Sequence, residues 1–330
     1  MKALVYQGNE TLSYTDLELP STREGEVLVE VVAAGICGSD LHAFHGKDER
    51  RPAPLILGHE VSGYADFDGQ RQAVVVNPLV TCGECPACER GEDNLCPDRQ
   101  IISMDPRPGS FAEYFAMPTR NLIPLPEGTD LNKAALCEPL ACGWHAVRLA
   151  EQSTGMKLSD INLIVCGAGA VGLGTALSAR ALGVKNIWVI ETLPGRRANA
   201  EREGLIAIDP SDLADHDLPA IDAVIDAVGI MPTRALASER LRPGGTLVHI
   251  GLGNADGGFD IRRATLQEIK FVGSYTYTMK HFKEVVDALL ANKFGHLDWF
   301  QVESAVEGQT WFERLSNNEV SSAKVLLTFN

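Results

Sequence analysis

Hydrophobic and polar positions divide the chain into parts with different patterns. Residues 2–7 and 26–33 are short apolar runs bounded by Gly and Pro, as in β-strands, and this irregular β pattern continues to about residue 126. From about residue 161, apolar runs such as 161–166 (INLIVC) alternate with helical stretches. Because near-continuous Val, Ile and Leu runs separated by helices are typical of a parallel sheet covered on both faces, an α/β part follows the β-rich part.

The pattern changes again near the end of the chain. Residues 279–292 carry apolar side chains at helical spacing, which predicts an amphipathic helix: Phe282, Val285, Val286, Leu289 and Leu290. Residues 296–330 then return to a β-rich pattern. We infer that the chain returns to its first domain, so that the α/β part is an insertion.

Composition and charge limit the kinds of partner. The 330 residues are 45% hydrophobic and 22% charged, which allows about two domains with sizeable cores. The net charge of -15 disfavours nucleic acid and anionic membranes as partners. The first residues lack the features of a signal peptide, and no apolar run approaches the about 18 residues of a membrane span. We therefore expect a cytoplasmic protein whose eight cysteines stay reduced.

Four of these cysteines form a C-x2-C-x2-C-x7-C pattern: Cys82, Cys85, Cys88 and Cys96. Four neighbouring thiolates repel one another unless a cation neutralises them, and Zn²⁺ with four sulfur ligands is the usual solution. Such a site leaves no open position, so we expect it to be structural. Two alternatives are four unrelated cysteines and a redox dithiol. The surrounding Glu, Gly, Asp and Pro residues argue against buried core thiols, and the loop lacks the βαβ context of a redox pair.

A second metal site is suggested by Cys37, His59 and Glu138, with Glu60 next to His59. One thiolate, one imidazole and one carboxylate, with water in the fourth position, make the ligand set of a catalytic zinc. Each residue also has a structural interpretation, as a core thiol or a hydrogen-bonded polar group. Because the residues are scattered, spacing alone leaves this site open.

The segment Gly167-Ala168-Gly169-Ala170-Val171-Gly172 follows a predicted strand and opens a predicted helix. Glycines there let the backbone approach a pyrophosphate, which the helix N-terminus attracts. Glu191 ends the next strand, where a carboxylate binds the adenosine ribose and repels a 2′-phosphate. This favours NAD over NADP, although Arg196 and Arg197 weaken the preference unless they are solvated charges on a helix.

Taken together, these segments resemble the medium-chain dehydrogenase/reductase family, in its zinc-containing polyol and threonine dehydrogenase branch. The motifs follow the family's order: GICGSDLH, LGHE, the four-cysteine segment, GSFAEYF, CEPL, the glycine motif and LRPGGTLVHIG. The resemblance implies an α/β protein with a GroES-like catalytic domain, residues 1–146 and 279–330. A Rossmann domain of strand order 3-2-1-4-5-6 is inserted at residues 147–278, and the active site lies in the cleft between the domains. It also implies a homo-oligomer, a tetramer or a dimer.

The resemblance assigns roles to residues at matching positions. Cys37, His59 and Glu138 match the catalytic zinc ligands, and Glu60 matches a carboxylate that approaches or replaces a ligand in relatives. Cys137, next to Glu138, is an alternative sulfur ligand.

The remaining implied roles concern the proton and the cofactor. Asp40 matches the carboxylate that orients the zinc-bound histidine, Ser39 the hydroxyl that contacts the substrate oxygen, and His42 the next member of a proton relay. The implied cofactor contacts are Gly167, Gly169, Ala170, Val171, Gly172, Glu191, Arg196, Val228, Gly251 and Leu252. One departure from the family is the segment 61–73, which is several residues short and predicts a trimmed hairpin.

These parts predict a zinc- and NAD-dependent dehydrogenase for a secondary alcohol of polyol, sugar-alcohol or sugar-acid type, or for the corresponding ketone. The alternatives are a phosphorylated polyol and an amino or hydroxy acid such as threonine. Lys47, Arg50 or Arg51 could bind a substrate anion, unless their loop is simply solvated and balanced by its own acidic residues. A zinc-free reductase and a non-catalytic dinucleotide-binding protein remain as other classes.

Overall fold

A computed structural model of the chain describes residues 1–67 and 69–329, which form two compact units. Unit 1 comprises Met1–Glu138, Thr278–Leu290 and the stretch from Trp299 onward. Unit 2 comprises Pro139–Tyr277 and Ala291–Asp298. Among the helices that the structure describes, none has the length and apolar composition needed to cross a bilayer.

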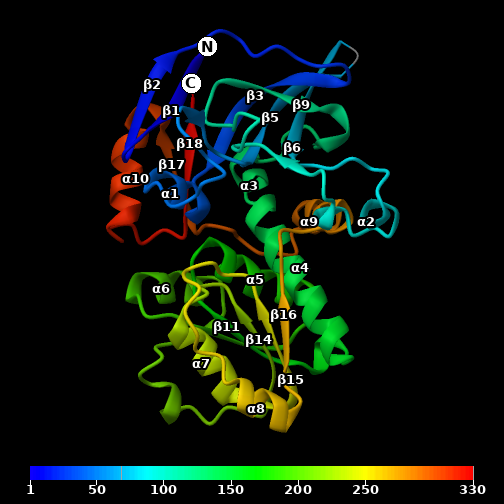
Figure 1. Cartoon of the computed structure of the whole chain (residues 1–330), viewed down its shortest axis with the longest axis vertical. Helices are drawn as coiled ribbons and strands as arrows, with labels where there is room; N and C mark the ends of the chain where they lie inside the picture. Colours follow the sequence, from blue (N-terminus) through cyan, green and yellow to red (C-terminus); the bar gives the residue numbers. More distant parts are fainter. Residues whose placement is uncertain (68, 330) are drawn as a thin grey trace. The chain divides into compact units, whose positions relative to one another are not determined.

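Unit 1 is rich in β-strands (Figure 1). Its larger sheet has the order β10 (Leu122–Pro124), β6 (Gln70–Val76), β5 (Glu60–Phe67), β3 (Glu26–Gly35), β18 (Lys324–Thr328) and β17 (Phe300–Ser304), with β9 (Tyr114–Pro118) also on β3. A smaller sheet joins β2 (Thr11–Asp16), β1 (Lys2–Gly8) and β4 (Leu55–Ile56). Because β18 pairs with β3, the end of the chain completes a sheet that begins near its start.

The hairpin of β5 and β6 covers the shortened segment 61–73. The two strands pair antiparallel from Ser62↔Val75 to Phe67↔Gln70. Asp68 lies outside the described residues. The strands converge on a core that includes Phe44, Phe111 and Phe312.

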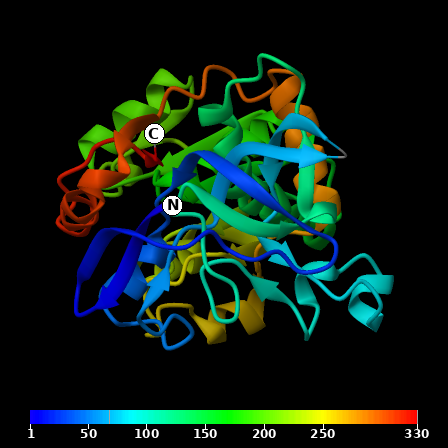
Figure 2. The same cartoon turned by 90° about the horizontal axis from the view of Figure 1, so that it is seen from above.

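Short helices and one longer helix complete unit 1: α1 (Gly38–Phe44), α2 (Pro86–Glu89), α3 (Leu131–Ala135), α9 (Met279–Leu290) and α10 (Gly308–Ser316). The predicted amphipathic helix is α9, which buries Phe282, Val285 and Val286. Strands β7 (Leu79–Val80) and β8 (Gln100–Ile101) flank the four-cysteine loop, which Figure 2 shows in cyan, extending away from the strands of unit 1.

Unit 2 is a six-stranded parallel sheet (Figure 1). Its order is β13 (Ile206–Ile208), β12 (Asn186–Ile190), β11 (Asn162–Cys166), β14 (Ile221–Asp226), β15 (Leu241–His249) and β16 (Lys270–Gly273). In chain order this is 3-2-1-4-5-6, so the predicted Rossmann topology and fold class are confirmed. The central strands are buried on both faces, which explains their continuous apolar runs.

The helices of unit 2 connect its strands: α5 (Ala170–Ala181), α6 (Pro194–Arg202), α7 (Met231–Arg240) and α8 (Ile261–Gln267). Helix α4 (Cys137–Thr154) leads into the unit. Each of α5, α6 and α7 packs against strands that it connects.

Candidate metal centres and cofactor site

A candidate catalytic metal centre lies in unit 1 where β3 ends and β5 begins. Ligand atoms of Cys37, His59 and Glu60 all lie within 4.8 Å of one another. Glu60 is paired with Gly35 across β3 and β5, and Cys37 lies two residues after the end of β3, at the start of α1. Strand pairing therefore brings together residues that are scattered along the sequence.

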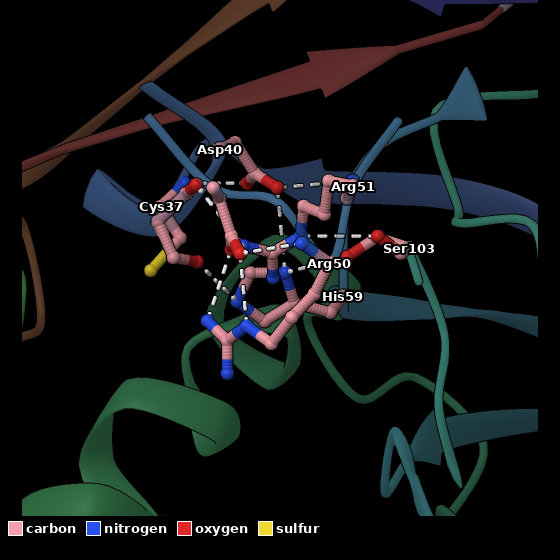
Figure 3. Close-up of polar contacts among 9 residues, drawn as sticks. Cys37, Asp40, Arg50, Arg51, His59 and Ser103 are labelled. Carbon is pink, nitrogen blue, oxygen red and sulfur yellow. Dashed lines mark hydrogen bonds and ion pairs between the residues drawn. The ribbon is translucent and has the colours of Figure 1, made fainter. Parts of the chain in front are cut away.

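Asp40 connects the two segments that carry these ligands. Its Oδ2 accepts a hydrogen bond from the Cys37 N–H at 2.9 Å, and its Oδ1 accepts one from the Gly58 N–H at 3.3 Å. Oδ1 also lies 3.5 Å from His59 Nδ1 (Figure 3). Burial alone would raise the pKa of Asp40, but the neighbouring His59 and Arg51 hold it below its usual value. An ionised Asp40 behind the imidazole has the geometry that its predicted orienting role needs.

Two serine hydroxyls flank the ring of His59. Ser39 Oγ lies 3.5 Å from Nε2, and Ser103 Oγ lies 3.5 Å from Nδ1. Ser39 thus lies on the ring edge opposite Asp40, where its predicted contact with the substrate oxygen would be made. His42 lies exposed on α1, and its place in a proton relay stays a prediction. Ser103 was not predicted, since it belongs to no recognisable motif.

Glu60 forms a buried ion pair with Lys324, which sequence reasoning also missed. Lys324 Nζ donates to Glu60 Oε1 at 2.6 Å and to the Ile36 carbonyl at 2.8 Å. Burial would lower the pKa of Lys324, but Glu60, Cys37 and Glu138 raise it above its usual value. The ammonium therefore stays charged among these acidic groups.

The residues present fit a zinc ion. Glu60 Oε2 is buried and has no hydrogen-bond partner among the described residues, and a buried acceptor of this kind requires one. Gly35 leaves room for it, because a Cβ there would lie 2.1 Å from Oε2. Thiolate sulfur, imidazole nitrogen and carboxylate oxygen are the ligands that zinc takes in catalytic sites.

Glu138, the carboxylate predicted first, has a different position. It is buried in the first turn of α4 and is not in the group formed by Cys37, His59 and Glu60. Glu138 nevertheless helps to raise the pKa of Lys324, the residue that pairs with Glu60. The structure thus groups the alternative carboxylate, Glu60, with the other two ligands, and ligation by Glu138 stays a prediction. Cys137 is fully buried and is likewise not in that group, so its role as an alternative sulfur ligand also stays a prediction.

The four predicted structural ligands come together in one cluster: Cys82, Cys85, Cys88 and Cys96. The Sγ atoms of Cys82 and Cys96, and those of Cys85 and Cys88, lie 3.5 Å apart. The backbone N–H of Glu84 helps to lower the pKa of Cys82 to about 7, whereas burial raises that of Cys88 to about 12. Four converging thiols fit a structural zinc without an open position.

The cysteine loop also contacts α9. Asp93, in the short 3-10 helix before Cys96, accepts a hydrogen bond from the N–H of Met279 at 3.0 Å. Met279 is the first residue of α9, so a carboxylate of the loop satisfies an otherwise unpaired donor at the helix start.

In unit 2, each glycine of the dinucleotide motif meets a different steric requirement. Gly167 has φ +94°, and a Cβ at Gly172 would lie 2.1 Å from the Gly167 carbonyl oxygen. Gly169 has open space, with Arg196 Nη1 3.9 Å from the position of a Cβ. These are the tight turn, the close helix packing and the accessible backbone that a pyrophosphate site needs.

The predicted partners of this loop lie around it. Glu191 Oε2 accepts a hydrogen bond from the Ala168 N–H at 2.8 Å. Arg197 pairs with Asp209 at 2.8 Å, whereas the buried Nε of Arg196 has no partner in the described part of the chain.

Val228 lies next to Gly167 of the motif, and Gly251 lies next to Val228. A Cβ at Gly167 would lie 2.7 Å from Val228 Cγ2, and a Cβ at Gly251 would lie 2.2 Å from the Val228 carbonyl carbon. Leu252 is 77% exposed. Their cofactor contacts stay predictions.

The fold and the two donor clusters define a zinc-containing, NAD(P)-dependent dehydrogenase that acts on CH–OH groups. Residues 23–127 match the alcohol dehydrogenase GroES-like domain, and residues 170–291 match the zinc-binding dehydrogenase domain. The chain belongs to the zinc-binding medium-chain alcohol dehydrogenase family.

Individual relatives act on polyhydroxylated compounds, according to their names. The chain is 34% identical to L-galactonate-5-dehydrogenase of Escherichia coli (strain K12), over 86% of each chain. It is 30% identical to sorbitol dehydrogenase of Arabidopsis thaliana, over 82% of this chain and 79% of the relative. The structure also resembles an alcohol dehydrogenase of Escherichia coli CFT073 solved with NADH, with a TM-score of 0.88, 25% identity and coverage of 100% and 99%.

The space beside Glu60 gives a direct test of the metal centre. In Gly35→Ala, the added Cβ would displace the Glu60 carboxylate, so zinc affinity at this centre should fall by about 10- to 100-fold. We expect metal analysis after mild chelation to find the cysteine-bound zinc alone. Gly273→Ala, at the end of another strand and with no atom within 4 Å of a Cβ, should retain both ions. Full zinc retention in Gly35→Ala would contradict the proposed role of Glu60.

Proposed function

We propose that this protein oxidises a secondary alcohol of a polyol, sugar alcohol or sugar acid to a ketone, with NAD⁺ as the hydride acceptor, and catalyses the reverse reaction. The observation that carries this proposal is the group of the partly buried Cys37 and the buried His59 and Glu60, on a chain that also carries a Rossmann glycine motif. Two relatives with polyhydroxylated substrates in their names support this substrate class.

Residues of unit 1 have separate roles in the proposed reaction, in proton transfer and in orienting the metal ligands. When bound, zinc polarises the alcohol oxygen and lowers the pKa of its proton. Ser39, beside His59 Nε2, would relay that proton: its oxygen takes the proton of the alcohol while its own hydroxyl proton passes to the exposed His42, which releases a proton to solvent. Asp40 holds the imidazole, and Lys324 binds one oxygen of Glu60, which leaves the other oxygen available to hold the ion.

The basic loop after α1 does not favour a phosphorylated substrate. Arg51 is buried and bonded to Ser39, Asp48 and Ser103, and Arg50 is paired with Asp48. Lys47 is exposed. Both candidate arginines therefore bind other groups of the protein. This supports a substrate that is an uncharged polyol, or a sugar acid whose carboxylate does not bind to these arginines.

Substrate panels with and without metal test the proposed function. Polyols, sugar acids and their phosphate esters are each supplied with NAD⁺, and NADH formation is followed by absorbance. We expect turnover of unphosphorylated secondary alcohols, loss of activity on chelation and recovery with Zn²⁺. Glu60→Gln should lower kcat/KM by at least about tenfold through weaker metal binding. Activity that survives complete loss of zinc from this centre would refute the mechanism.

We further propose that NAD⁺ is preferred over NADP⁺ because Glu191 lies at the glycine motif. Glu191→Gln keeps an oxygen for the Ala168 N–H but removes the negative charge. We expect the NAD⁺ preference, measured as the ratio of kcat/KM values, to fall by about tenfold, as loss of one charged hydrogen bond implies. Glu201→Ala, which removes an exposed charge from α6, should leave the ratio unchanged. An unchanged ratio in Glu191→Gln would overturn the assignment.

We propose that two copies associate through β16, an edge strand of the sheet in unit 2. Phe271 on this strand is 49% exposed, and Ile261 and Leu266 of α8 are each 68% exposed. An exposed apolar edge strand is a template for pairing with another strand, and homo-oligomers are usually symmetric.

Light scattering after size-exclusion chromatography tests this association. Phe271→Glu should shift the protein toward monomer, because it places a charge on the paired edge. Ile206→Glu changes the opposite edge of the same sheet, at a residue that is 56% exposed, and should not alter the mass. Equal masses for the wild type and both variants would refute pairing through β16.

A further inference from the structure

The guanidinium of Arg51 joins three separate segments of unit 1. Its Nε donates to the Ser103 carbonyl at 3.0 Å, and its Nη1 donates to the Ser39 carbonyl at 3.1 Å. Nη1 also pairs with Asp48 at 2.8 Å. The Arg51 side chain is 1% exposed, so these bonds form away from solvent (Figure 3). Charge-assisted bonds in a buried setting are stronger than neutral ones.

The two carbonyls that Arg51 holds belong to the serines that flank His59. Ser39 Oγ lies 3.5 Å from Nε2 and Ser103 Oγ lies 3.5 Å from Nδ1. None of the bonds described for Arg51 is to the imidazole. Arg51 instead binds the backbone carbonyl of each of the two serines whose hydroxyls lie beside the ring. A shift of either carbonyl would move the attached hydroxyl relative to the ring.

Ser103 depends on such support. Its φ of +70° lies in the left-handed region, which is unfavourable for a residue with a Cβ, and it is fully buried. The bond from Arg51 Nε to its carbonyl is one interaction that holds this conformation.

Asp48 keeps the guanidinium in place. Burial would raise the pKa of Asp48, but bonds from Arg50 and the charge of Arg51 hold it below its usual value, so it stays ionised. Arg50 binds the same carboxylate through Nε at 2.8 Å and Nη2 at 2.9 Å. Its side chain is 58% exposed, and none of its described bonds reaches Ser39 or Ser103. Arg50 therefore shares the acidic partner of Arg51, whereas the bonds to the two carbonyls are described for Arg51.

We propose that Arg51 is a positioning residue, which sets the Ser39 and Ser103 hydroxyls against His59 and thereby controls metal retention and proton transfer at the Cys37, His59 and Glu60 centre. The role needs a guanidinium, because its separate donors reach both carbonyls and Asp48 together. A lysine ammonium is a compact point charge that keeps the pair with Asp48 but does not reproduce this geometry. The inference rests on the proposed zinc centre.

The experiment compares Arg51→Lys with Arg50→Lys, since both changes preserve charge next to Asp48. The first measurement is the rate at which zinc leaves the catalytic centre to a chelator, while the cysteine-bound zinc remains. We expect Arg51→Lys to speed this loss by at least about tenfold and Arg50→Lys to change it less than about twofold. The visible spectrum of the Co²⁺-substituted centre should also change in Arg51→Lys alone.

Kinetics separate positioning from binding. We expect kcat of Arg51→Lys to fall by at least about tenfold while KM for the cofactor changes little, because unit 2 is untouched. Unchanged zinc loss, Co²⁺ spectrum and kcat would overturn the proposal, and so would equal effects of the two lysine variants, which would point to loop charge instead.

Ser103→Ala keeps the proposal testable if Arg51→Lys does not fold. Removing this hydroxyl should also speed zinc loss and change the Co²⁺ spectrum, and no effect would contradict the proposed link to His59. Where both variants fold, their effects on zinc loss should be non-additive, because they act through one contact chain. If the wild type binds no zinc at this centre, the proposed function fails. If it binds zinc and the Arg51 variant is normal, this inference alone fails.

Discussion

Buried negative charge at the end of β3 is the constraint on which the site depends. The Cys37 thiol, Asp40 and Glu60 come together where Asp40 and Glu60 are both 0% exposed. Removing carboxylates from water costs several kcal/mol each unless donors or cations replace the lost hydration. Backbone N–H groups satisfy Asp40, and Lys324 satisfies one oxygen of Glu60. The second oxygen of Glu60 remains, and a metal ion shared with Cys37 and His59 would satisfy it.

Strand pairing around β3 brings these buried groups together. Pairing of β3 with β5 sets Gly35 opposite Glu60, and pairing of β3 with β18 brings in Lys324. A larger residue at Gly35 would occupy the space of the carboxylate. The site in unit 1 is therefore complete only when the chain has returned from unit 2. Strand β18, which carries Lys324, is as necessary to the metal centre as the segments that carry Cys37 and His59.

Local sequence patterns predicted the parts of the protein that are local in structure. The four cysteines lie in one loop and the glycine motif spans one strand-to-helix turn, so their spacing reports their geometry. Alternating apolar runs and helices predicted the parallel sheet, and resemblance to a family predicted its strand order, which the structure confirms.

The residues that escaped prediction act through tertiary contacts. Lys324 reaches Glu60 across 264 positions, and Arg51 reaches Ser103 across 52. Neither contact leaves a periodic or motif-like trace. The choice between Glu60 and Glu138 had the same difficulty, because both are carboxylates next to motif residues and their distances to Cys37 and His59 depend on how β5 and α4 are placed.

Anomalous diffraction at the zinc absorption edge, on crystals grown with zinc, would locate each bound ion and identify its ligands. We expect two peaks for each chain, one among the four cysteines and one bonded to Cys37, His59 and a carboxylate oxygen of Glu60. A peak among the four cysteines with none beside Cys37 and His59 would contradict the proposed catalytic centre.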